Sequence, residues 1–451
     1  MLKKLEMPKP VCLIESMQKN DFQVNQEALD ILSSIKQPVV VVAIVGKYRT
    51  GKSYLMNRLA GKHTGFSLGS TIQSETKGIW MWCVTHPCRE NHTLVLLDTE
   101  GLGDVEKGDQ RNDTWIFALA VLLSSTLIYN SIGTIDDEAV MTLHYVTELS
   151  KHIKISSGKS EKEASVEFAH VFPHFVWAVR DFMLELELNG KIITADEYLE
   201  NSLKIKVEAS NRKDPRNYIQ KYFPSRKCFV FDQPASKAKL KKIEQLSDND
   251  LDPAFVEQTS HFCNYIFTHS CEKIIQGETT VTGSMLGGLA KIYVDTIRSG
   301  EVPCLENAVE ALAEIENSTA CEQSFTLYRQ LLGERVKLHT ETQEELSTVH
   351  EVCLEKALQF FLAHSFKDED LVYQKKLKVC IIEEYERICK ENEKLSRDHC
   401  IALLQQLWKH LNPESFMRPK GYADYQLKLD EIIKEYRAAP GKGITVLILT
   451  V

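Results

Sequence analysis

Residues 39–53 read Val-Val-Val-Val-Ala-Ile-Val-Gly-Lys-Tyr-Arg-Thr-Gly-Lys-Ser, and this stretch decides the fold. A β-branched run that ends at a glycine is typical of a strand buried on both faces of a parallel sheet. Residues 53–60 then follow a helical pattern that ends at Gly61. Further strand candidates, several of them separated by helical patterns, lie at residues 80–84, 93–97, 125–129, 175–179 and 227–231. This alternation predicts an α/β domain with a mostly parallel sheet flanked by helices.

The last third of the chain has a different pattern. Residues 305–412 contain one glycine and no proline. Apolar side chains recur there at helical spacing and form amphipathic faces that must be buried against other helices. One such stripe consists of Leu305, Ala308, Val309, Leu312 and Ile315. We therefore predict an α/β domain over residues 1–310, an all-α helical bundle over 311–440 and a short apolar tail over 441–451.

Composition excludes several classes of protein. The 451 residues carry 54 Lys and Arg against 63 Asp and Glu, and a net charge of −9 gives no general attraction to nucleic acid. Twelve cysteines without a C-x-x-C pair indicate free thiols in a reducing compartment such as the cytoplasm. Residues 114–135 are uncharged, but their continuous apolar stretch is too short to cross a bilayer. We expect a helix followed by a strand there, and no transmembrane segment.

The segment after the first strand has the spacing G-x-x-x-x-G-K-S of a phosphate-binding loop. The two glycines let the backbone turn tightly, so that its N–H groups and the following helix N-terminus face the β-phosphate. Lys52 would reach the β- and γ-oxygens, and the Ser53 hydroxyl would bind Mg²⁺. The sequence therefore predicts a nucleotide site with Mg²⁺ as cofactor. The loop residues expected to contact the nucleotide are Gly46, Lys47, Tyr48, Arg49, Thr50, Gly51, Lys52 and Ser53.

A second element of this site follows the strand at residues 93–97. It reads Asp98-Thr99-Glu100-Gly101-Leu102. An acidic residue at the tip of a neighbouring strand can hold the Mg²⁺ shell, and the Gly101 N–H can reach the γ-phosphate. The D-x-x-G spacing suggests the switch of a GTPase, and we assign all five residues to the nucleotide site.

The residues alone leave the choice of base open. The guanine-reading tetrapeptide N/T-K-x-D is absent, but Arg180-Asp181 directly follows the strand candidate at 175–179. A carboxylate at a strand tip can accept hydrogen bonds from N1–H and the 2-amino group of guanine, whereas adenine offers neither pattern. Asp181 is then either the base reader or one half of a surface salt bridge with Arg180. An ATP-using P-loop enzyme is the alternative that goes with the second interpretation.

Three segments together resemble the interferon-inducible guanylate-binding proteins, which are dynamin-related large GTPases. They are residues 46–53, residues 73–80 (Gln-Ser-Glu-Thr-Lys-Gly-Ile-Trp) and residues 98–104 (Asp-Thr-Glu-Gly-Leu-Gly-Asp). The resemblance extends from about Glu15 to about Gly443. It implies a large GTPase domain, cleavage of GTP to GDP and on to GMP, and nucleotide-dependent homodimers or hetero-oligomers with related GTPases through that domain.

The resemblance also implies residue roles. Arg49 matches a built-in arginine finger that neutralises charge on the transferred phosphoryl group. Without the resemblance, Arg49 would be interpreted as a solvated loop residue. Ser74 matches the position that orients the attacking water, and Thr76 matches the switch threonine that binds Mg²⁺. Residues 239–250 match a guanine cap that pairs two such domains. The expected catalytic set is Arg49, Lys52, Ser74, Thr76 and Glu100, the metal set is Ser53, Thr76 and Asp98, and further nucleotide contacts are Leu68, Gly69, Ser70, Arg180 and Asp181.

Two departures from the family pattern bear on activity. Lys47 and Glu75 stand where relatives often have leucine and histidine, and both add charge beside the triphosphate. A nucleotide-switched scaffold with little turnover is therefore the alternative function.

No cysteine lies four residues from the end, so we expect no prenyl anchor. The resemblance implies defence against intracellular pathogens from the cytoplasm, with recruitment to vesicle, vacuolar or pathogen membranes.

Overall fold

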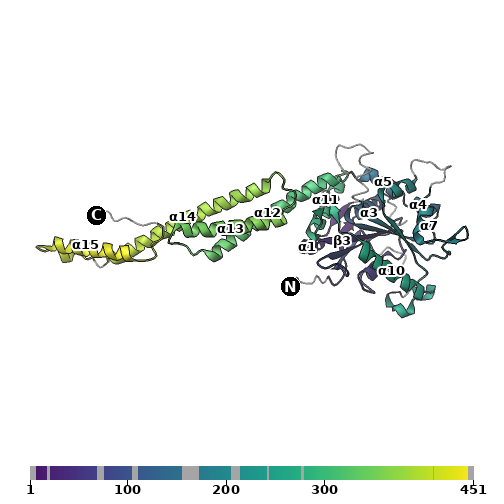
Figure 1. The fold of residues 1–451 in the computed structure, drawn as a ribbon, viewed down its shortest axis with the longest axis horizontal. Helices are drawn as coiled ribbons and strands as arrows, with labels where there is room; N and C mark the ends of the chain where they lie inside the picture. Colours follow the sequence, from purple (N-terminus) through teal and green to yellow (C-terminus); the bar gives the residue numbers. More distant parts are fainter. Residues whose placement is uncertain are drawn as a thin grey trace. The chain divides into compact units, whose positions relative to one another are not determined.

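The computed structural model describes residues 7–17, 21–68, 76–103, 110–154, 172–204, 214–240, 243–275, 279–409 and 411–444. Contacts divide the chain into two compact units, Met1–Leu312 and Ala313–Val451, whose common border falls beside the expected boundary at residue 310. The first unit holds the strands, and the second is helical (Figure 1).

A mixed sheet forms the centre of the first unit. Its strand order is β10-β7-β6-β3-β5-β4-β1-β2. The strands from β10 to β5 pair in parallel, whereas β4, β1 and β2 continue the sheet antiparallel. The expected α/β fold with a mostly parallel core is confirmed. The bounds are β1 Val11–Ser16, β2 Phe22–Val24, β3 Val39–Val45, β4 Ile79–Thr85, β5 Thr93–Thr99, β6 Thr126–Ile132, β7 His174–Arg180 and β10 Arg226–Val230. Two short hairpins, β8 Glu187–Leu188 with β9 Lys191–Ile192 and β11 Ile274–Ile275 with β12 Thr279–Thr280, lie outside it.

Helices cover the faces of this sheet. They are α1 Gln26–Ser34, α2 Lys52–Leu59, α3 Gln110–Leu123, α4 Asp137–Thr142, α5 His144–His152, α7 Ala195–Ser202, α8 Pro215–Tyr222, α9 Lys237–Leu240, α10 Pro253–His269 and α11 Gly283–Arg298, with 3-10 turns η2 Ile243–Gln245 and η3 Asp248–Asp250. The uncharged segment at 114–135 lies mainly in α3 and β6, as expected. Among the described residues, no helix is both long and apolar enough to span a membrane.

The second unit is built from long helices. They are α12 Leu305–Arg335, which begins in the first unit, then α13 Gln343–His364, α14 Val372–Trp408 and α15 Gly421–Ala438, with the 3-10 turn η4 Pro413–Phe416. The helical pattern predicted for residues 305–412 is thereby confirmed. One member of the first predicted stripe differs, because Ile315 is 48% exposed while Leu305, Ala308, Val309 and Leu312 are buried.

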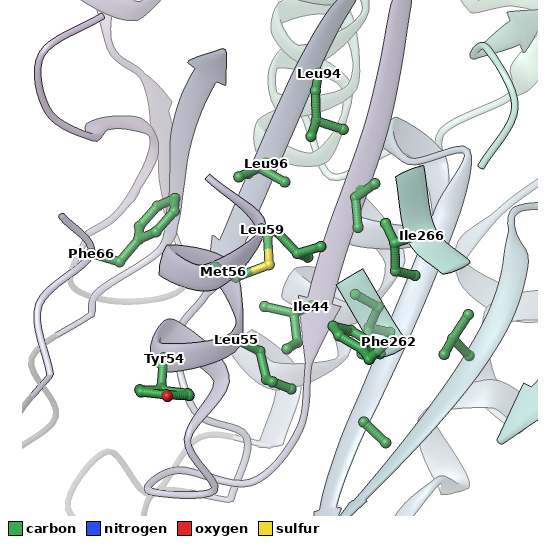
Figure 2. Packing of buried hydrophobic residues seen from close by; sticks show 14 of the residues in the cluster. Ile44, Tyr54, Leu55, Met56, Leu59, Phe66, Leu94, Leu96, Phe262 and Ile266 are labelled. Atoms are coloured by element: carbon green, nitrogen blue, oxygen red, sulfur yellow. The ribbon is translucent and has the colours of Figure 1, made fainter. Parts of the chain in front are cut away.

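The core of the first unit lies directly behind the loop of residues 46–51. Strand β3 is buried along its whole length, and its neighbours β5 and β6 are covered on both faces. Figure 2 shows how Leu55, Met56 and Leu59 of α2 meet Ile44 of β3 and Phe262 of α10. The loop between β3 and α2 is therefore held at both ends by buried elements. The sequence places it at the carboxyl edge of the parallel strands, where ligands bind in open α/β sheets.

Candidate functional site

The loop between β3 and α2 has the backbone of an anion-binding turn. Arg49 and Gly51 adopt left-handed conformations, with φ of 63° and 82°. A Cβ atom on Gly46 would lie 2.1 Å from the backbone oxygen of Asn130 on β6, so only glycine fits there. Left-handed residues that alternate with ordinary ones direct backbone N–H groups into one concavity, which is how such loops cradle phosphates.

Side chains within the loop hold the same shape. Lys52 is buried, and its ammonium donates to the carbonyl oxygens of Gly46 at 3.2 Å and Lys47 at 3.1 Å. The Thr50 hydroxyl donates to the same Lys47 oxygen at 2.9 Å. Lys47, Tyr48 and Arg49 themselves are exposed, and with the ends of β6 and α4 they line a cavity of about 480 Å³.

Three oxygen-bearing side chains meet beside the loop. Strand pairing sets Asp98 of β5 opposite Ile44 of β3, at the end of β3 that leads into the loop. The Ser53 hydroxyl donates to Asp98 Oδ2 at 2.6 Å. Burial raises the pKa of Asp98 to about 6, although Lys52 and the hydroxyls of Ser53 and Thr76 act in the opposite direction. The structure thus brings together the three side chains that were predicted to bind the metal.

This cluster fits a magnesium ion. Hydroxyl and carboxylate oxygens are the ligands that Mg²⁺ prefers, and it commonly takes one or two carboxylates together with phosphate oxygens. Asp98 is fully buried, yet its Oδ1 has no hydrogen-bond partner among the described residues. A buried carboxylate oxygen without a partner is costly unless a cation or a donor satisfies it. Ser53, Thr76 and Asp98 are therefore the residues that would hold the ion.

Glu100 links the segment after β5 to its neighbours. Its Oε2 accepts the Gly78 N–H at 2.7 Å, and its Oε1 accepts a hydrogen bond from the Asn112 side chain. Its backbone N–H in turn donates to the Gly78 carbonyl at 2.8 Å. In this structure the buried Glu100 carboxylate holds the start of β4 against the end of β5. A catalytic role for Glu100 stays a prediction.

Gly101 lies against the phosphate loop. A Cβ atom on Gly101 would lie 2.2 Å from the Tyr48 Cβ and 2.3 Å from its Cα. The next residue, Leu102, donates its N–H to the Gly46 carbonyl at 3.0 Å. The D-x-x-G segment and the loop are therefore in direct contact.

Arg180, at the end of β7, is buried rather than at the surface. Its guanidinium carbon lies 5.0 Å from the ring centre of Phe231, 5.1 Å from Phe255 and 5.9 Å from Tyr54. Burial lowers the pKa of Arg180 to about 10. The following residue, Asp181, has a φ of 53° and is half-buried, and burial raises its pKa. The interpretation of Arg180 and Asp181 as a surface salt bridge is wrong for Arg180, while base reading by Asp181 stays a prediction.

The segment matched to a guanine cap is tied to the helix that follows the loop. Arg58 of α2 forms a two-fold hydrogen-bonded ion pair with Asp248 of η3, at 2.7 and 2.9 Å. The Leu68 N–H donates to Glu244 Oε1 of η2 at 3.0 Å. These contacts give Leu68 and residues 243–250 fixed positions relative to α2.

Some predicted residues cannot be placed, and some important ones were not predicted. Gly69, Ser70, Ser74 and Glu75 lie outside the described residues. Asn130, which donates to the Thr50 carbonyl at 2.7 Å, was missed. An asparagine inside the apolar run of β6 was the available signal, because a polar side chain in a doubly covered strand needs a partner.

Comparison with known proteins identifies relatives of the whole chain. The profile described as guanylate-binding protein, N-terminal domain, matches residues 19–275, and that of the C-terminal domain matches residues 277–448. Human guanylate-binding protein 2 is 52% identical over 454 residues, which cover 98% of this chain and 77% of that protein. Guanylate-binding protein 1 of Chlorocebus aethiops has the same identity and coverage, and human guanylate-binding protein 6 is 52% identical over 97% of this chain and 71% of its own length.

Proposed function

This chain belongs to the guanylate-binding protein family of large GTPases, and we propose that it hydrolyses GTP at the loop of residues 46–53 with a bound Mg²⁺. The observation that carries this proposal is the meeting of Lys52, Ser53 and Asp98 beside a loop in which Arg49 and Gly51 are left-handed. In phosphoryl transfer a lysine at this position binds phosphate oxygens, and a serine and an aspartate at these positions bind the ion that neutralises them.

The protein's own groups account for binding and orientation. Lys52 would leave the carbonyls of Gly46 and Lys47 for the β- and γ-phosphates, a change that needs only side-chain rotation. Mg²⁺, when bound, supplies positive charge to the polyphosphate. Arg49 is exposed and belongs to the loop itself, so its guanidinium is free to approach charge that develops on the transferred phosphoryl group. Asp181 would select guanine through N1–H and the 2-amino group.

The finer parts of the function rest on similarity to the family. We infer that GDP is cleaved further to GMP, and that two GTPase domains, from this chain or from related GTPases, pair when nucleotide is bound. The setting would be interferon-induced innate defence against intracellular pathogens, from the cytoplasm and on vesicle or vacuolar membranes. Separation of nucleotides by chromatography after incubation with GTP and Mg²⁺ tests the first inference. Light scattering with and without a non-hydrolysable GTP analogue tests the second.

The binding experiment is a calorimetric titration of the full chain with a non-hydrolysable GTP analogue in the presence of Mg²⁺. We expect saturable heat, and we expect Lys52→Ala to lose it. Lys62→Ala is the matched control, because Lys62 is an exposed lysine just beyond α2 and should bind as the parent does. Absence of heat with the folded parent protein would contradict the proposal. Efficient competition by excess ATP would contradict base selection by Asp181.

The nucleotide-switched scaffold is separated from the enzyme by turnover. In a single-turnover measurement, the parent protein should cleave GTP faster than Arg49→Ala by at least about a hundredfold, the lower range for loss of one group that stabilises transition-state charge. Equal rates for the two proteins, with unchanged nucleotide affinity, would favour a scaffold that binds GTP with little turnover.

A further inference from the structure

Asn130 is a fully buried amide in the central strand β6, next to the buried aromatic Tyr129. It lies near the end of β6 and has no exposed surface. Its Nδ2 donates to the Thr50 carbonyl at 2.7 Å, and this hydrogen bond is itself buried. Its other polar atom, Oδ1, has no partner among the described residues. A buried amide with an unsatisfied oxygen is destabilising compared with an apolar residue of the same size, so core stability alone does not account for asparagine at this position.

The two halves of the phosphate loop are held by different groups. The first half is fixed by the Leu102 N–H on the Gly46 carbonyl and by Thr50 and Lys52 on the Lys47 carbonyl. The second half begins at Arg49, with a φ of 63°, and includes Gly51, with a φ of 82°. Left-handed residues on both sides of Thr50 make the orientation of its peptide groups sensitive to a single hydrogen bond. Asn130 supplies that hydrogen bond.

The orientation of one peptide group follows directly. The carbonyl of Thr50 and the N–H of Gly51 belong to the same planar trans peptide, so they point in opposite directions. Because Asn130 holds the carbonyl toward β6, the Gly51 N–H is turned to the opposite side of the loop. In loops of this spacing, backbone N–H groups on the inner side contact the α- and β-phosphates.

We propose that Asn130 is a positioning residue for nucleotide binding: it fixes the peptide between Thr50 and Gly51 so that the Gly51 N–H is presented to the β-phosphate. This inference rests on the proposed function, since it presumes that a guanine nucleotide occupies the loop. Asn130 does not touch the nucleotide and acts through the Thr50 carbonyl alone.

The test replaces Asn130 by leucine, which has similar size but no donor. A hydrogen bond to a charged group is worth about 1.5–3 kcal/mol, so affinity for GDP and for a non-hydrolysable GTP analogue should fall about tenfold or more. Affinity for GMP should fall less than about threefold, because GMP has no β-phosphate for the Gly51 N–H to contact. Asn130→Thr places a polar side chain that is too short to reach the Thr50 carbonyl, and if Asn130→Leu does not fold it should show the same loss of GDP and GTP-analogue affinity.

Asn317→Leu is the matched control. Asn317 is also buried and donates to a backbone carbonyl at 2.7 Å, but its partner is Phe366 in the helical unit. This variant should lower the melting temperature and leave all three nucleotide affinities unchanged. Equal weakening of GDP and GMP by Asn130→Leu, or no weakening in a folded variant, overturns the inference. Failure of the parent protein to bind any of the three nucleotides would instead overturn the proposed function.

Discussion

Lys273 is a buried lysine that makes the stability of the first unit depend on pH. Only 3% of its surface is exposed, and its ammonium donates to the Ser124 carbonyl, at the end of α3, at 2.8 Å. No carboxylate pairs with it among the described residues. Burial lowers the pKa of Lys273 from 10.5 to about 7. Its backbone N–H donates to the Val39 carbonyl, so this residue lies at the base of the strand that leads into the loop.

The sign of the effect follows from proton uptake. Between about pH 7 and pH 10.5 the unfolded chain keeps a proton on Lys273 that the folded chain has lost. The free energy of unfolding of the parent therefore rises with pH in this window, by up to about 1.4 kcal/mol per pH unit from this one group. Below pH 7 both states are protonated, and the contribution no longer changes with pH.

Lys273→Met isolates this contribution, because methionine fills a similar volume and cannot titrate. Urea unfolding can be followed by tryptophan fluorescence, since four of the five tryptophans, at positions 80, 82, 115 and 177, lie in the first unit. We expect the difference in unfolding free energy, parent minus variant, to be flat below pH 7 and to rise from pH 7 to pH 10. Lys291→Met, at an exposed position of α11, controls for the loss of one positive charge. Parallel curves for parent and Lys273→Met from pH 6 to pH 10 would refute the reasoning.

Three further predictions follow from contacts at and beyond the site. Gly101→Ala would bring a Cβ within 2.3 Å of Tyr48, so it should weaken nucleotide binding, measured by calorimetry, by at least about tenfold. Gly333→Ala, in α12 with open space around the added Cβ, should instead raise the free energy of unfolding of the helical unit by about 0.5–1 kcal/mol in urea titrations. A double-mutant cycle on Arg58→Met and Asp248→Asn should give a coupling of about 1 kcal/mol, modest because the Asp248 side chain is 41% exposed, and each single variant should speed hydrogen exchange in residues 243–250. Unchanged exchange there would mean that other contacts hold the segment.

The sequence predicted the central strands well because their side chains are buried on both faces. The run at residues 39–45 needs no alternation to be identified, and its glycine marks where the phosphate loop begins. The meeting of Ser53 and Asp98 was also predictable, since Ser53 comes shortly after β3, Asp98 lies near the end of the neighbouring strand β5, and the carboxyl ends of parallel strands lie at the same edge. Strands β1 and β2 were missed because short antiparallel edge strands have little apolar pattern of their own.

Contacts between distant segments could not be predicted from the sequence. Arg58 and Asp248 are 190 positions apart, and nothing local to either residue indicates the other. The sequence left a surface salt bridge between Arg180 and Asp181 open, because nothing near Arg180 in the chain indicates the aromatic rings of Tyr54, Phe231 and Phe255 that lie around its guanidinium. Ile315 was expected in the core because of its helical spacing, but its side chain is exposed. Spacing shows which side of a helix a residue faces, and it does not show how far along that side a neighbouring helix packs.

The unsatisfied polar atoms of the described residues are unevenly distributed. Four buried side-chain nitrogen or oxygen atoms without a hydrogen-bond partner among the described residues belong to just three residues, Asp98, Asn130 and Arg180. Each such atom costs about 1–3 kcal/mol in the folded state. All three residues contact or flank the phosphate loop, and each stands at or near the carboxyl end of a central strand. A fold that only had to be stable would place residues there whose polar atoms are all paired, or apolar residues such as those that fill most of the inner positions of these strands. Stability is lost where, in the proposed function, the carboxylate, the amide and the guanidinium would face or orient a charged ligand, which is the pattern expected of a site shaped by binding rather than by folding.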